Sequence, residues 1–247
     1  MSRIGSAARV RYGVLANRGD AVECPLCGQS FKAFRDDWNR PNAICWRCGS
    51  HERHRALWLY LAQLHPELLG SARRLLHFAP EWCLERKLRG ITGLQYATAD
   101  LDPSKGELQL DITAIALPDG SFDAILCSHV LEHIEDDATA MRELRRILEP
   151  GGWAIVMVPL DINRANTYED PSITAAQDRQ REFLQFDHVR LYAPDIADRL
   201  ASAGFEVAVE SVAGRLGAQA AARYALLESD HVFVCRGQAG PTQCMAR

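Results

Sequence analysis

Hydrophobic and polar positions form their clearest pattern between residues 108 and 159. Phe122–Cys127 is a short apolar run, as expected for a strand covered on both faces. A second such run is Trp153–Val158. Between them, apolar residues recur at helical spacing, at Met141, Leu144, Ile147 and Leu148. Strand, helix and strand in this order predict a right-handed βαβ unit and a parallel sheet.

Polar and turn-forming residues mark the limits of these elements. Pro118–Ser121 is a turn cluster in front of the first strand. Asp136 and Asp137 supply an N-cap for the helix. Pro150–Gly152 ends the helix before the second strand. The turn and capping residues therefore place the element boundaries where the hydrophobic pattern does.

Shorter apolar runs extend the prediction over most of the chain. They predict helices at Arg55–His65 and Pro194–Ala203, and further strands at Arg73–Phe78, Leu94–Thr98, Leu108–Ile112, Phe205–Val209 and His231–Cys235. Strands that alternate with helices are typical of an α/β fold.

Composition narrows the classes of protein that fit. A chain of 247 residues with 47% hydrophobic content can bury a large core. Its net charge of −4 implies no general attraction to nucleic acid. No stretch approaches the ~20 apolar residues needed to cross a bilayer, and no secretory signal is seen. We expect a cytoplasmic protein with reduced thiols, and no membrane partner.

Four of the eight cysteines follow a metal-binding spacing. Cys24 and Cys27 form one C-x-x-C pair, Cys45 and Cys48 form another, and 17 residues separate the pairs. Each pair presents two sulfurs to one face, so that two pairs complete a tetrahedron around zinc. Four protein ligands leave no open position, which predicts a structural Zn²⁺ on which this small module depends for folding. A redox pair and buried structural cysteines stay open as alternatives.

The patterns divide the chain into five parts. We expect a flexible basic tail at 1–19, a zinc ribbon at 20–54, a linking helix at 55–70, a main domain at 71–238 and a second tail at 239–247. The first tail has a second interpretation, as an arm that touches an anionic substrate or a partner subunit. Within the main domain, 160–192 is a polar insertion, whose length favours a substrate lid.

Three blocks of the main domain carry a resemblance to a known family. They are Leu117–Ile125 (Leu-Pro-Asp-Gly-Ser-Phe-Asp-Ala-Ile), Ser128–Ile134 (Ser-His-Val-Leu-Glu-His-Ile) and Leu144–Gly152 (Leu-Arg-Arg-Ile-Leu-Glu-Pro-Gly-Gly). In order and spacing, they resemble the class I S-adenosylmethionine-dependent methyltransferases, in the type 11-like branch that includes small-molecule and quinone O-methyltransferases. The resemblance covers roughly residues 73 to 235. It implies a Rossmann-like, seven-stranded, mostly parallel sheet with an antiparallel last strand.

The resemblance also implies where the cofactor S-adenosylmethionine would bind, beginning with the loop after the first strand. In the family this strand ends in an acidic residue and a glycine-rich loop. Here His77 replaces the acid, and the loop through Ala79 and Glu81 contains no glycine. Glu81 could accept the methionine ammonium group in place of the missing acid. Alternatively, Glu81 caps the following helix.

Acidic residues after the next two strands fit the remainder of the cofactor. Asp100, followed by Leu101, lies where a carboxylate can accept hydrogen bonds from the ribose diol. By the resemblance, Asp111 and Ile112 contact the adenine, although Asp111 could instead be a turn cap before Thr113.

The fourth strand ends at Ser128 and His129. Because open parallel sheets bind ligands beyond the carboxyl ends of their strands, we expect both residues near the methionine portion or the methyl group.

The insertion supplies the predicted acid–base chemistry. His188 has a side chain suited to accept a proton at neutral pH, and the adjacent Asp187 could orient it. His129 is a second catalytic candidate, and a purely structural role for His188 stays open. Three arginines of the insertion, Arg164, Arg181 and Arg190, favour a polar or anionic acceptor.

These features predict O-methylation, at a hydroxyl or carboxylate, of a polar small molecule, a sugar or a peptide natural-product intermediate. An RNA methyltransferase is the first alternative, opposed by the net negative charge and the lack of a basic stripe. A catalytically silent binding subunit is the second, motivated by the glycine-free loop. Homodimer formation stays open.

Overall fold

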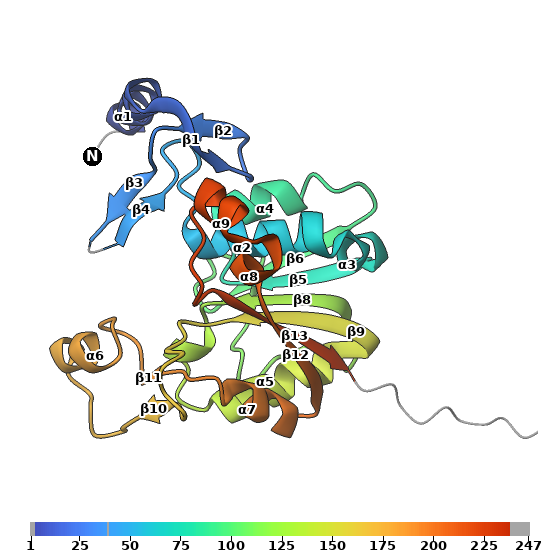
Figure 1. The fold of residues 1–247 in the computed structure, drawn as a ribbon. Helices are drawn as coiled ribbons and strands as arrows, with labels where there is room; N and C mark the ends of the chain where they lie inside the picture. The colour runs from blue at the N-terminus through green and yellow to red at the C-terminus, as the bar shows by residue number, and fades with distance from the viewer. Residues whose placement is uncertain (1–2, 39, 238–247) are drawn as a thin grey trace, which may run out of the picture. The chain divides into compact units, whose positions relative to one another are not determined.

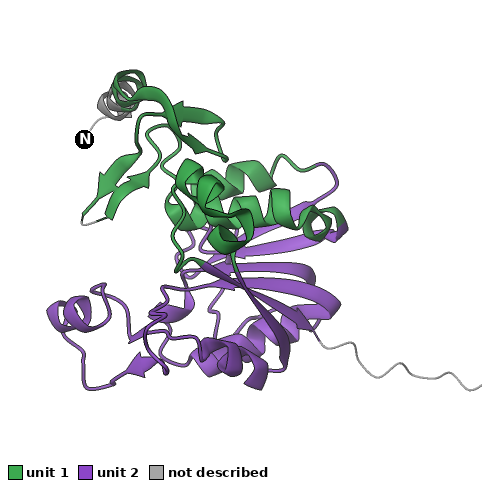
Figure 2. Cartoon of the chain, in the orientation of Figure 1, with its two compact units in different colours: residues 1–70, 81–91, 211–230 green, residues 71–80, 92–210, 231–247 purple. Residues whose placement is uncertain are grey.

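The computed structural model describes residues 3–38 and 40–237, which form two compact units. Figure 2 shows the division: residues 1–70, 81–91 and 211–230 make the first unit, and 71–80, 92–210 and 231–247 make the second. The chain passes from the first unit to the second after residue 70, near the expected boundary. Two later segments, 81–91 and 211–230, nevertheless belong to the first unit. The tail expected at 239–247 lies outside the described residues.

The second unit is built on a seven-stranded sheet with the order β12-β13-β9-β8-β5-β6-β7 (Figure 1). Its strands are β5 (Arg74–Phe78), β6 (Gln95–Asp100), β7 (Leu108–Gln109), β8 (Phe122–Ser128), β9 (Leu148–Met157), β12 (Phe205–Ser211) and β13 (His231–Gly237). Strands β7, β6, β5, β8 and β9 pair in parallel, and β13 runs antiparallel to β9. The predicted fold class is confirmed. The third strand is shorter than predicted, and β9 begins earlier, at Leu148.

The register brings the carboxyl ends of the central strands to one edge. Phe78 of β5 pairs with Cys127 of β8, which pairs with Val156 of β9. Ala99 of β6 lies opposite Phe78 on the other side. The residues directly after these strands therefore lie along one edge of the sheet. Open parallel sheets bind ligands at this edge.

Helix α5 (Asp137–Ile147) and helix α7 (Ile196–Ser202) contribute to the core of this unit. Asp136 caps α5 as predicted, because its side chain accepts a hydrogen bond from the Thr139 amide at 2.9 Å. The apolar stripe of α5 is fully buried with the strands, and it consists of Ala140, Met141, Leu144 and Ile147.

The insertion at 160–192 contains more regular structure than a loop. It holds β10 (Tyr168–Glu169), helix α6 (Ala176–Glu182) and β11 (Arg190–Leu191), and β10 pairs with β11 in an antiparallel manner. A short 3₁₀ turn, η2 (Leu131–His133), lies between β8 and α5.

The first unit consists of two small hairpins and short helices. The elements are α1 (Arg3–Ala16), β1 (Arg18–Cys24), β2 (Gln29–Phe31), β3 (Arg35–Asp37), β4 (Arg40–Ile44), α2 (Glu52–Leu59), the π-helical turn η1 (Tyr60–Leu64), α3 (Pro66–Ser71), α4 (Trp82–Leu88), α8 (Val212–Leu216) and α9 (Ala218–Tyr224). The sequence favoured a flexible tail at 1–19, whereas residues 3–16 form helix α1 in the structure. Alanines and other good helix formers in this segment explain the difference.

Side-chain contacts explain why residues 211–230 belong to the first unit. Arg223 of α9 donates from Nη2 to Asp20 Oδ1 at 2.7 Å and to Glu23 Oε2 at 3.2 Å, which ties α9 to strand β1. Residues separated by about two hundred positions thus share one unit, a pairing that no local pattern indicates.

Candidate functional site

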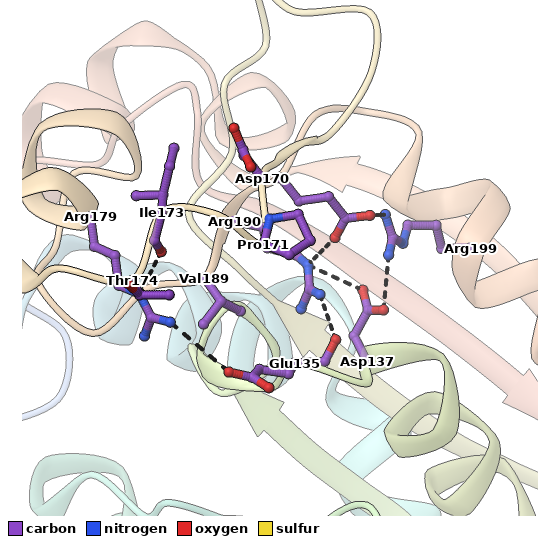
Figure 3. Close-up of a pocket in the computed structure, with 11 residues that line it drawn as sticks. Glu135, Asp137, Asp170, Pro171, Ile173, Thr174, Arg179, Val189, Arg190 and Arg199 are labelled. Carbon is purple, nitrogen blue, oxygen red and sulfur yellow. Dashed lines mark hydrogen bonds and ion pairs between the residues drawn. The ribbon is translucent and has the colours of Figure 1, made fainter.

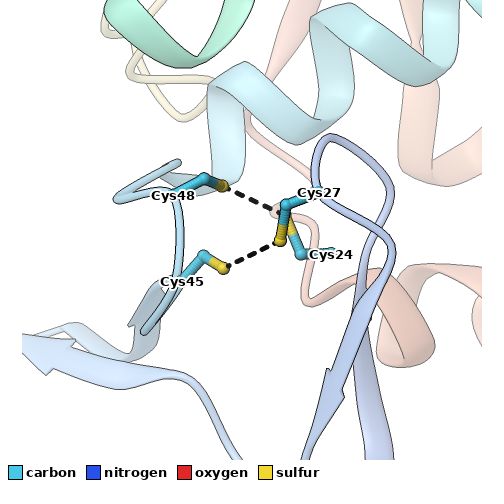
Figure 4. Close-up of side chains that lie close together, drawn as sticks. All are labelled: Cys24, Cys27, Cys45 and Cys48. Atoms are coloured by element: carbon cyan, nitrogen blue, oxygen red, sulfur yellow. Dashed lines mark hydrogen bonds between the residues drawn. The ribbon is translucent and has the colours of Figure 1, made fainter. Parts of the chain in front are cut away.

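The first candidate site is the cluster of four cysteines in the first unit (Figure 4). The sulfurs of Cys24 and Cys48 are 3.5 Å apart, and those of Cys27 and Cys45 are 3.7 Å apart. All four sulfurs lie within 4.8 Å of one another. A disulfide would need about 2.05 Å, whereas a tetrahedral zinc site with Zn–S of about 2.3 Å has sulfurs about 3.8 Å apart. The spacing therefore fits a four-thiolate metal site.

Local backbone geometry presents these sulfurs. Gly28 and Gly49 follow the two C-x-x-C pairs, and each has a φ of 69°. Each glycine donates its amide hydrogen to the carbonyl of the first cysteine of its pair, at 2.8 Å to Cys24 and 3.0 Å to Cys45. Because this left-handed conformation favours glycine, the C-x-x-C-Gly pattern carries the turn within the sequence itself.

The four thiols perturb one another's ionisation. Hydrogen bonding with Cys27 lowers the pKa of Cys24 to about 7, and hydrogen bonding with Cys24 lowers the pKa of Cys48. Hydrogen bonding with Cys24 raises the pKa of both Cys27 and Cys45. Protons are thus shared unequally among sulfurs in contact, and four neighbouring thiolates would need a cation to offset their repulsion.

A buried arginine supports this cluster. Arg55 is fully buried and stacks over the Phe34 ring at 4.2 Å. Its guanidinium donates to four carbonyl oxygens, those of Ala43 at 2.8 Å, Ser50 at 2.9 Å, Tyr224 at 2.7 Å and Ala225 at 2.9 Å. The arginine therefore joins the turn that carries Cys45 and Cys48 to the end of helix α9. Sequence reasoning did not identify this role, since its partners lie up to 170 positions away.

The second candidate site lies at the carboxyl edge of the sheet in the second unit. After β5, Ala79 has a φ of 46°, a left-handed conformation that glycine adopts more readily. Its amide donates to the Ala99 carbonyl at 2.8 Å. The loop therefore has a glycine-like backbone without a glycine. His77 is fully buried, with Nδ1 2.9 Å from the Tyr96 hydroxyl.

Glu81 does not take the predicted capping role through its side chain. It occupies the N-cap position of α4, but its side chain makes no capping hydrogen bond. Its Oε1 instead lies 3.3 Å from His54 Nε2, and His54 Nδ1 lies 3.4 Å from the Cys83 sulfur. All three residues belong to the first unit.

Asp100 ends β6 at the carboxyl edge. Its Oδ1 accepts the amide hydrogen of Asp102 at 2.8 Å, which forms a tight turn. Among the described residues, no hydrogen bond reaches Oδ2, so that one oxygen can still accept from a ligand. The neighbouring Leu101 is 68% exposed.

Asp111 forms the turn cap that the sequence left open. Its Oδ1 accepts from the Thr113 amide at 2.8 Å and from the Thr113 hydroxyl at 2.7 Å. The bond from the Thr113 side chain, followed by that from its amide, lowers the pKa of Asp111. The next residue, Ile112, is buried in the core.

Ser128 and His129 end strand β8. Ser128 is 3% exposed, and among the described residues its Oγ has no hydrogen-bond partner. His129 has a φ of 55°, so that left-handed residues follow two adjacent strands, at Ala79 and at His129. Strained backbone and an unsatisfied hydroxyl at a common sheet edge are typical of a ligand site.

A cluster of histidines surrounds the buried side chain of Glu132, which sequence reasoning left unassigned. His129 Nδ1 is 3.2 Å and His188 Nε2 is 4.0 Å from Glu132 Oε1. The rings of His133 and His188 meet edge to face, 4.8 Å apart. Glu132 belongs to the Ser128–Ile134 block of the family resemblance. No local pattern indicates that His188, 56 positions later, lies beside it.

The predicted orientation of His188 by Asp187 does not form. His188 Nδ1 is 2.9 Å from the Phe183 carbonyl, whereas Asp187 Oδ2 lies 3.5 Å from His133 Nδ1. Neighbours in an irregular turn need not point the same way, and here the two side chains meet different partners. Burial lowers the pKa of His188.

The three arginines of the insertion already have acidic partners. Arg164 pairs with Asp161 at 3.1 Å, and Arg181 pairs with Asp178 at 2.9 Å. Arg190 is 4% exposed and donates to Glu169 at 2.8 Å. The anionic acceptor that these arginines favoured therefore has less support than the sequence indicated.

A pocket of about 420 Å³ lies beside this network (Figure 3). Arg199 bridges Asp137 at 2.9 Å and Glu169 at 3.2 Å along one wall. Arg179, on another wall, comes no closer than 4.0 Å to Glu135. The lining mixes both charges with apolar side chains, and it consists of Glu135, Asp137, Glu169, Asp170, Pro171, Ile173, Thr174, Arg179, Val189, Arg190 and Arg199.

Comparison with known proteins agrees with this architecture. Residues 70–156 match a protein-family model described as a methyltransferase domain. A Mycolicibacterium smegmatis protein, named as a probable S-adenosylmethionine-dependent methyltransferase, is 31% identical over 125 residues, which are 48% of this chain and 44% of that protein. The ubiquinone biosynthesis O-methyltransferase of Chromobacterium violaceum is 32% identical over 79 residues, or 27% of this chain and 34% of that enzyme.

Solved structures resemble the chain in fold. The [4+2]-cyclase SpnF has a TM-score of 0.55 and 15% identity, covering 95% of this chain and 94% of its own. The 1,6-didemethyltoxoflavin-N1-methyltransferase of Burkholderia thailandensis has a TM-score of 0.50 and 16% identity, covering 76% and 78%. The second unit thus has the Rossmann-like methyltransferase fold. That a cyclase shares the fold shows that the fold alone does not define the reaction.

The chain spans less than half the length of the curated relatives described above. Within residues 3–38 and 40–237, no helix combines the length and the apolar character that crossing a membrane requires.

Proposed function

We propose that this chain is an S-adenosylmethionine-dependent methyltransferase that acts on an oxygen atom of a polar acceptor. The observation that carries the proposal is the carboxyl edge of the sheet. There, Ala79, Asp100 and Ser128 lie at the ends of three neighbouring strands. They offer a glycine-like backbone and, among the described residues, a carboxylate oxygen and a hydroxyl that make no hydrogen bond. The matched methyltransferase domain spans all three positions.

In this proposal each part of the edge has a task. Asp100 Oδ2 accepts a hydrogen bond from the ribose of the cofactor, while Oδ1 keeps its turn with Asp102. The backbone at Ala79 and the Ser128 hydroxyl face the methionine portion. Asp111 and Ile112 border the adenine, as the family resemblance implies. Because the sulfonium supplies the driving force, the protein mainly aligns donor and acceptor and excludes water.

His129 is the better placed of the predicted bases. It follows the central strand β8, its side chain is 20% exposed, and Glu132 lies behind its Nδ1 at 3.2 Å. A carboxylate near one ring nitrogen favours the positive charge that the ring would gain on taking a proton from an acceptor hydroxyl. His188 is 5% exposed and faces Glu132, which favours a supporting role. A carboxylate acceptor would need no base.

The acceptor would be polar, because the pocket beside the insertion presents both charges. Its volume of about 420 Å³ suits a small molecule, a sugar unit or a short peptide segment. Arg179 is the cation of its wall most available to an acceptor carboxylate, since its nearest acidic oxygen is 4.0 Å away.

We also propose that Cys24, Cys27, Cys45 and Cys48 hold a structural Zn²⁺. The sulfur spacing supports a closed tetrahedral site, and four protein ligands leave no position for a substrate. The ion would replace a hydrophobic core that the two hairpins are too small to supply.

The test is calorimetric titration of zinc-loaded protein with S-adenosylhomocysteine, using an Asp100→Asn variant. Asparagine keeps the oxygen that accepts the Asp102 amide but presents an amide group where the ribose needs an acceptor. We expect micromolar binding by the wild type and a loss of roughly tenfold to a hundredfold in the variant. Asp102→Asn is the matched control, because its carboxylate meets residues of its own turn, Ser104 at 2.9 Å and 2.7 Å and Lys105 at 3.7 Å.

The outcomes separate the functions. Binding that weakens in Asp100→Asn alone supports the cofactor site and justifies a screen of acceptors. A folded wild type that binds no S-adenosylhomocysteine would overturn the enzyme proposal and favour a silent binding subunit instead.

A further inference from the structure

The side chain of Glu132 is buried in a way that calls for a ligand. The residue is 1% exposed, and among the described residues neither carboxylate oxygen has a hydrogen-bond partner. His129 Nδ1 lies at ion-pair distance, 3.2 Å, but without hydrogen-bond geometry, and His188 Nε2 lies at 4.0 Å. A buried carboxylate whose oxygens accept no hydrogen bond is costly, so native structures usually complete it with donors or a metal.

Two histidines lie near this carboxylate, and each has one ring nitrogen near a backbone carbonyl. His188 Nδ1 is 2.9 Å from the Phe183 carbonyl, and His133 Nδ1 is 3.3 Å from the Asp187 carbonyl. A neutral imidazole that donates from Nδ1 carries its lone pair on Nε2. Histidines that bind metals are usually held by such a bond from the second nitrogen.

The distances leave room for one ion. One ligand atom from each of Glu132, His133 and His188 lies within 4.8 Å of the others. Ligands about 2.0–2.2 Å from a common ion are separated by roughly 3–4.4 Å. The three side chains therefore need only small rotations to close on a metal.

We propose that Glu132, His133 and His188 bind a divalent transition-metal ion. Two imidazoles and one carboxylate suit Zn²⁺, Fe²⁺ or Co²⁺ better than Ca²⁺ or Mg²⁺, which favour all-oxygen sites. Three protein ligands leave open positions, unlike the closed cysteine cluster. The site goes beyond the proposed methyl transfer and does not depend on it, because metal binding requires neither cofactor nor acceptor.

A protonated histidine could replace the metal ion as the positive partner of the Glu132 carboxylate. His188 meets the Phe183 carbonyl through Nδ1, which leaves the lone pair of a neutral ring on Nε2, the nitrogen nearer Glu132. His129 beside this carboxylate is compatible with a metal, because a carboxylate has about four lone-pair sites and can accept from His129 while it binds an ion.

The experiment adds Co²⁺ to the 247-residue chain after its cysteine cluster has been loaded with zinc. Absorption spectroscopy and equilibrium dialysis then report one further bound Co²⁺ per chain. The spectrum should lack thiolate-to-metal charge transfer, since the proposed ligands contain no sulfur. We expect Glu132→Gln and His188→Ala to weaken this binding at least about tenfold. His65→Ala is the matched control in the first unit, where His65 pairs with Glu67 at 2.8 Å.

Folding and function are checked in the same samples. Glu132→Gln preserves the shape of the side chain, and His133→Ala replaces a ligand whose side chain is 30% exposed, so at least one variant should fold. Co²⁺ that fails to bind the wild type, or that binds all folded variants equally, overturns the metal site. Titration with S-adenosylhomocysteine is a separate measurement. A protein that binds S-adenosylhomocysteine but fails to bind Co²⁺ would contradict the metal site and leave the proposed function standing.

Discussion

The two clusters of metal-ligand type in this protein arise in opposite ways. The four cysteines come from two short turns, and their spacing along the chain places the sulfurs within 4.8 Å. The cluster of Glu132, His133 and His188 joins the 3₁₀ turn after β8 to an insertion more than fifty residues later. Glycine-ended turns encode the first cluster locally. The second exists only because the insertion folds back, where the Val189 amide donates to the Glu132 carbonyl at 2.9 Å.

The largest effect should follow from removal of one cysteine ligand. Cys45→Ser leaves three of the four sulfurs of the proposed zinc site. We expect the first unit to lose cooperative unfolding, because structural zinc contributes on the order of 10 kcal/mol. Metal analysis and chemical denaturation measure the loss. Zinc-free protein with an unchanged unfolding midpoint would show that local spacing alone, without metal, maintains the hairpins.

The next effect tests whether this cluster is as local as its spacing indicates. Arg55→Met removes the donor to four carbonyls, two of them at the end of α9. Buried acceptors left without donors should lower the free energy of unfolding by about 3 kcal/mol or more. Denaturant unfolding measures the change, with the exposed Arg47→Met as control. A change below about 0.5 kcal/mol would mean that the long-range contacts add nothing.

Each unit contains a buried carboxylate, and the two carboxylates predict opposite dependences of stability on pH. Burial raises the pKa of Asp230 to about 7, whereas the pKa of Glu132 is lowered, because burial opposes its ionisation but the neighbouring His129 outweighs it. For Asp230 the folded pKa exceeds the unfolded value, so stability is greatest at low pH and declines as pH rises toward about 7.

Asp230→Asn should therefore raise the unfolding free energy near pH 8 by about 2 kcal/mol and have little effect near pH 4. Thermal unfolding at both pH values measures the difference. For Glu132→Gln we expect the opposite change, a loss of unfolding free energy at neutral pH. The wild type gains stability from its ionised carboxylate above about pH 4.3, and this gain is lost as pH falls. An equal pH response in both variants would contradict the assignment.

Ser128→Ala separates a ligand site from a structural hydroxyl. Among the described residues Ser128 Oγ has no partner, so its removal should stabilise the ligand-free protein by about 1 kcal/mol. The same change should weaken binding of S-adenosylhomocysteine if the hydroxyl faces the cofactor. Calorimetry and thermal unfolding report the two effects. The control is Ser121→Ala, at a half-buried serine whose hydroxyl donates to the Pro118 carbonyl. Loss of stability together with unchanged binding would indicate a packing role.

The smallest effect compares two alanines with left-handed backbone, one in each unit. Ala79 follows β5 with a φ of 46°, and Ala225 ends α9 with a φ of 47°. Glycine at either position should raise the unfolding free energy by at most about 1 kcal/mol. Ala79→Gly should also retain binding of S-adenosylhomocysteine. A destabilised Ala79→Gly would show that the loop does not need the conformation described here.

Regular elements and local turns were predictable because their signals lie within a few residues. The apolar run of β8, the Asp136 cap of α5 and the cysteine turns all appear as expected. Adjacent residues misled where the backbone was irregular. Asp187 and His188 are neighbours in sequence, yet Asp187 meets His133 and His188 meets Phe183 and Glu132.

The sequence by itself determined the α/β sheet, the zinc-type spacing and the residues at the strand ends, since each depends on periodicity or on turn chemistry over short distances. Only the tertiary structure decided that 211–230 join the first unit, that Arg55 meets α9 and that Glu132 is enclosed by histidines. The physical reason is that burial and side-chain pairing across long loops depend on how the whole chain packs, which no local pattern encodes.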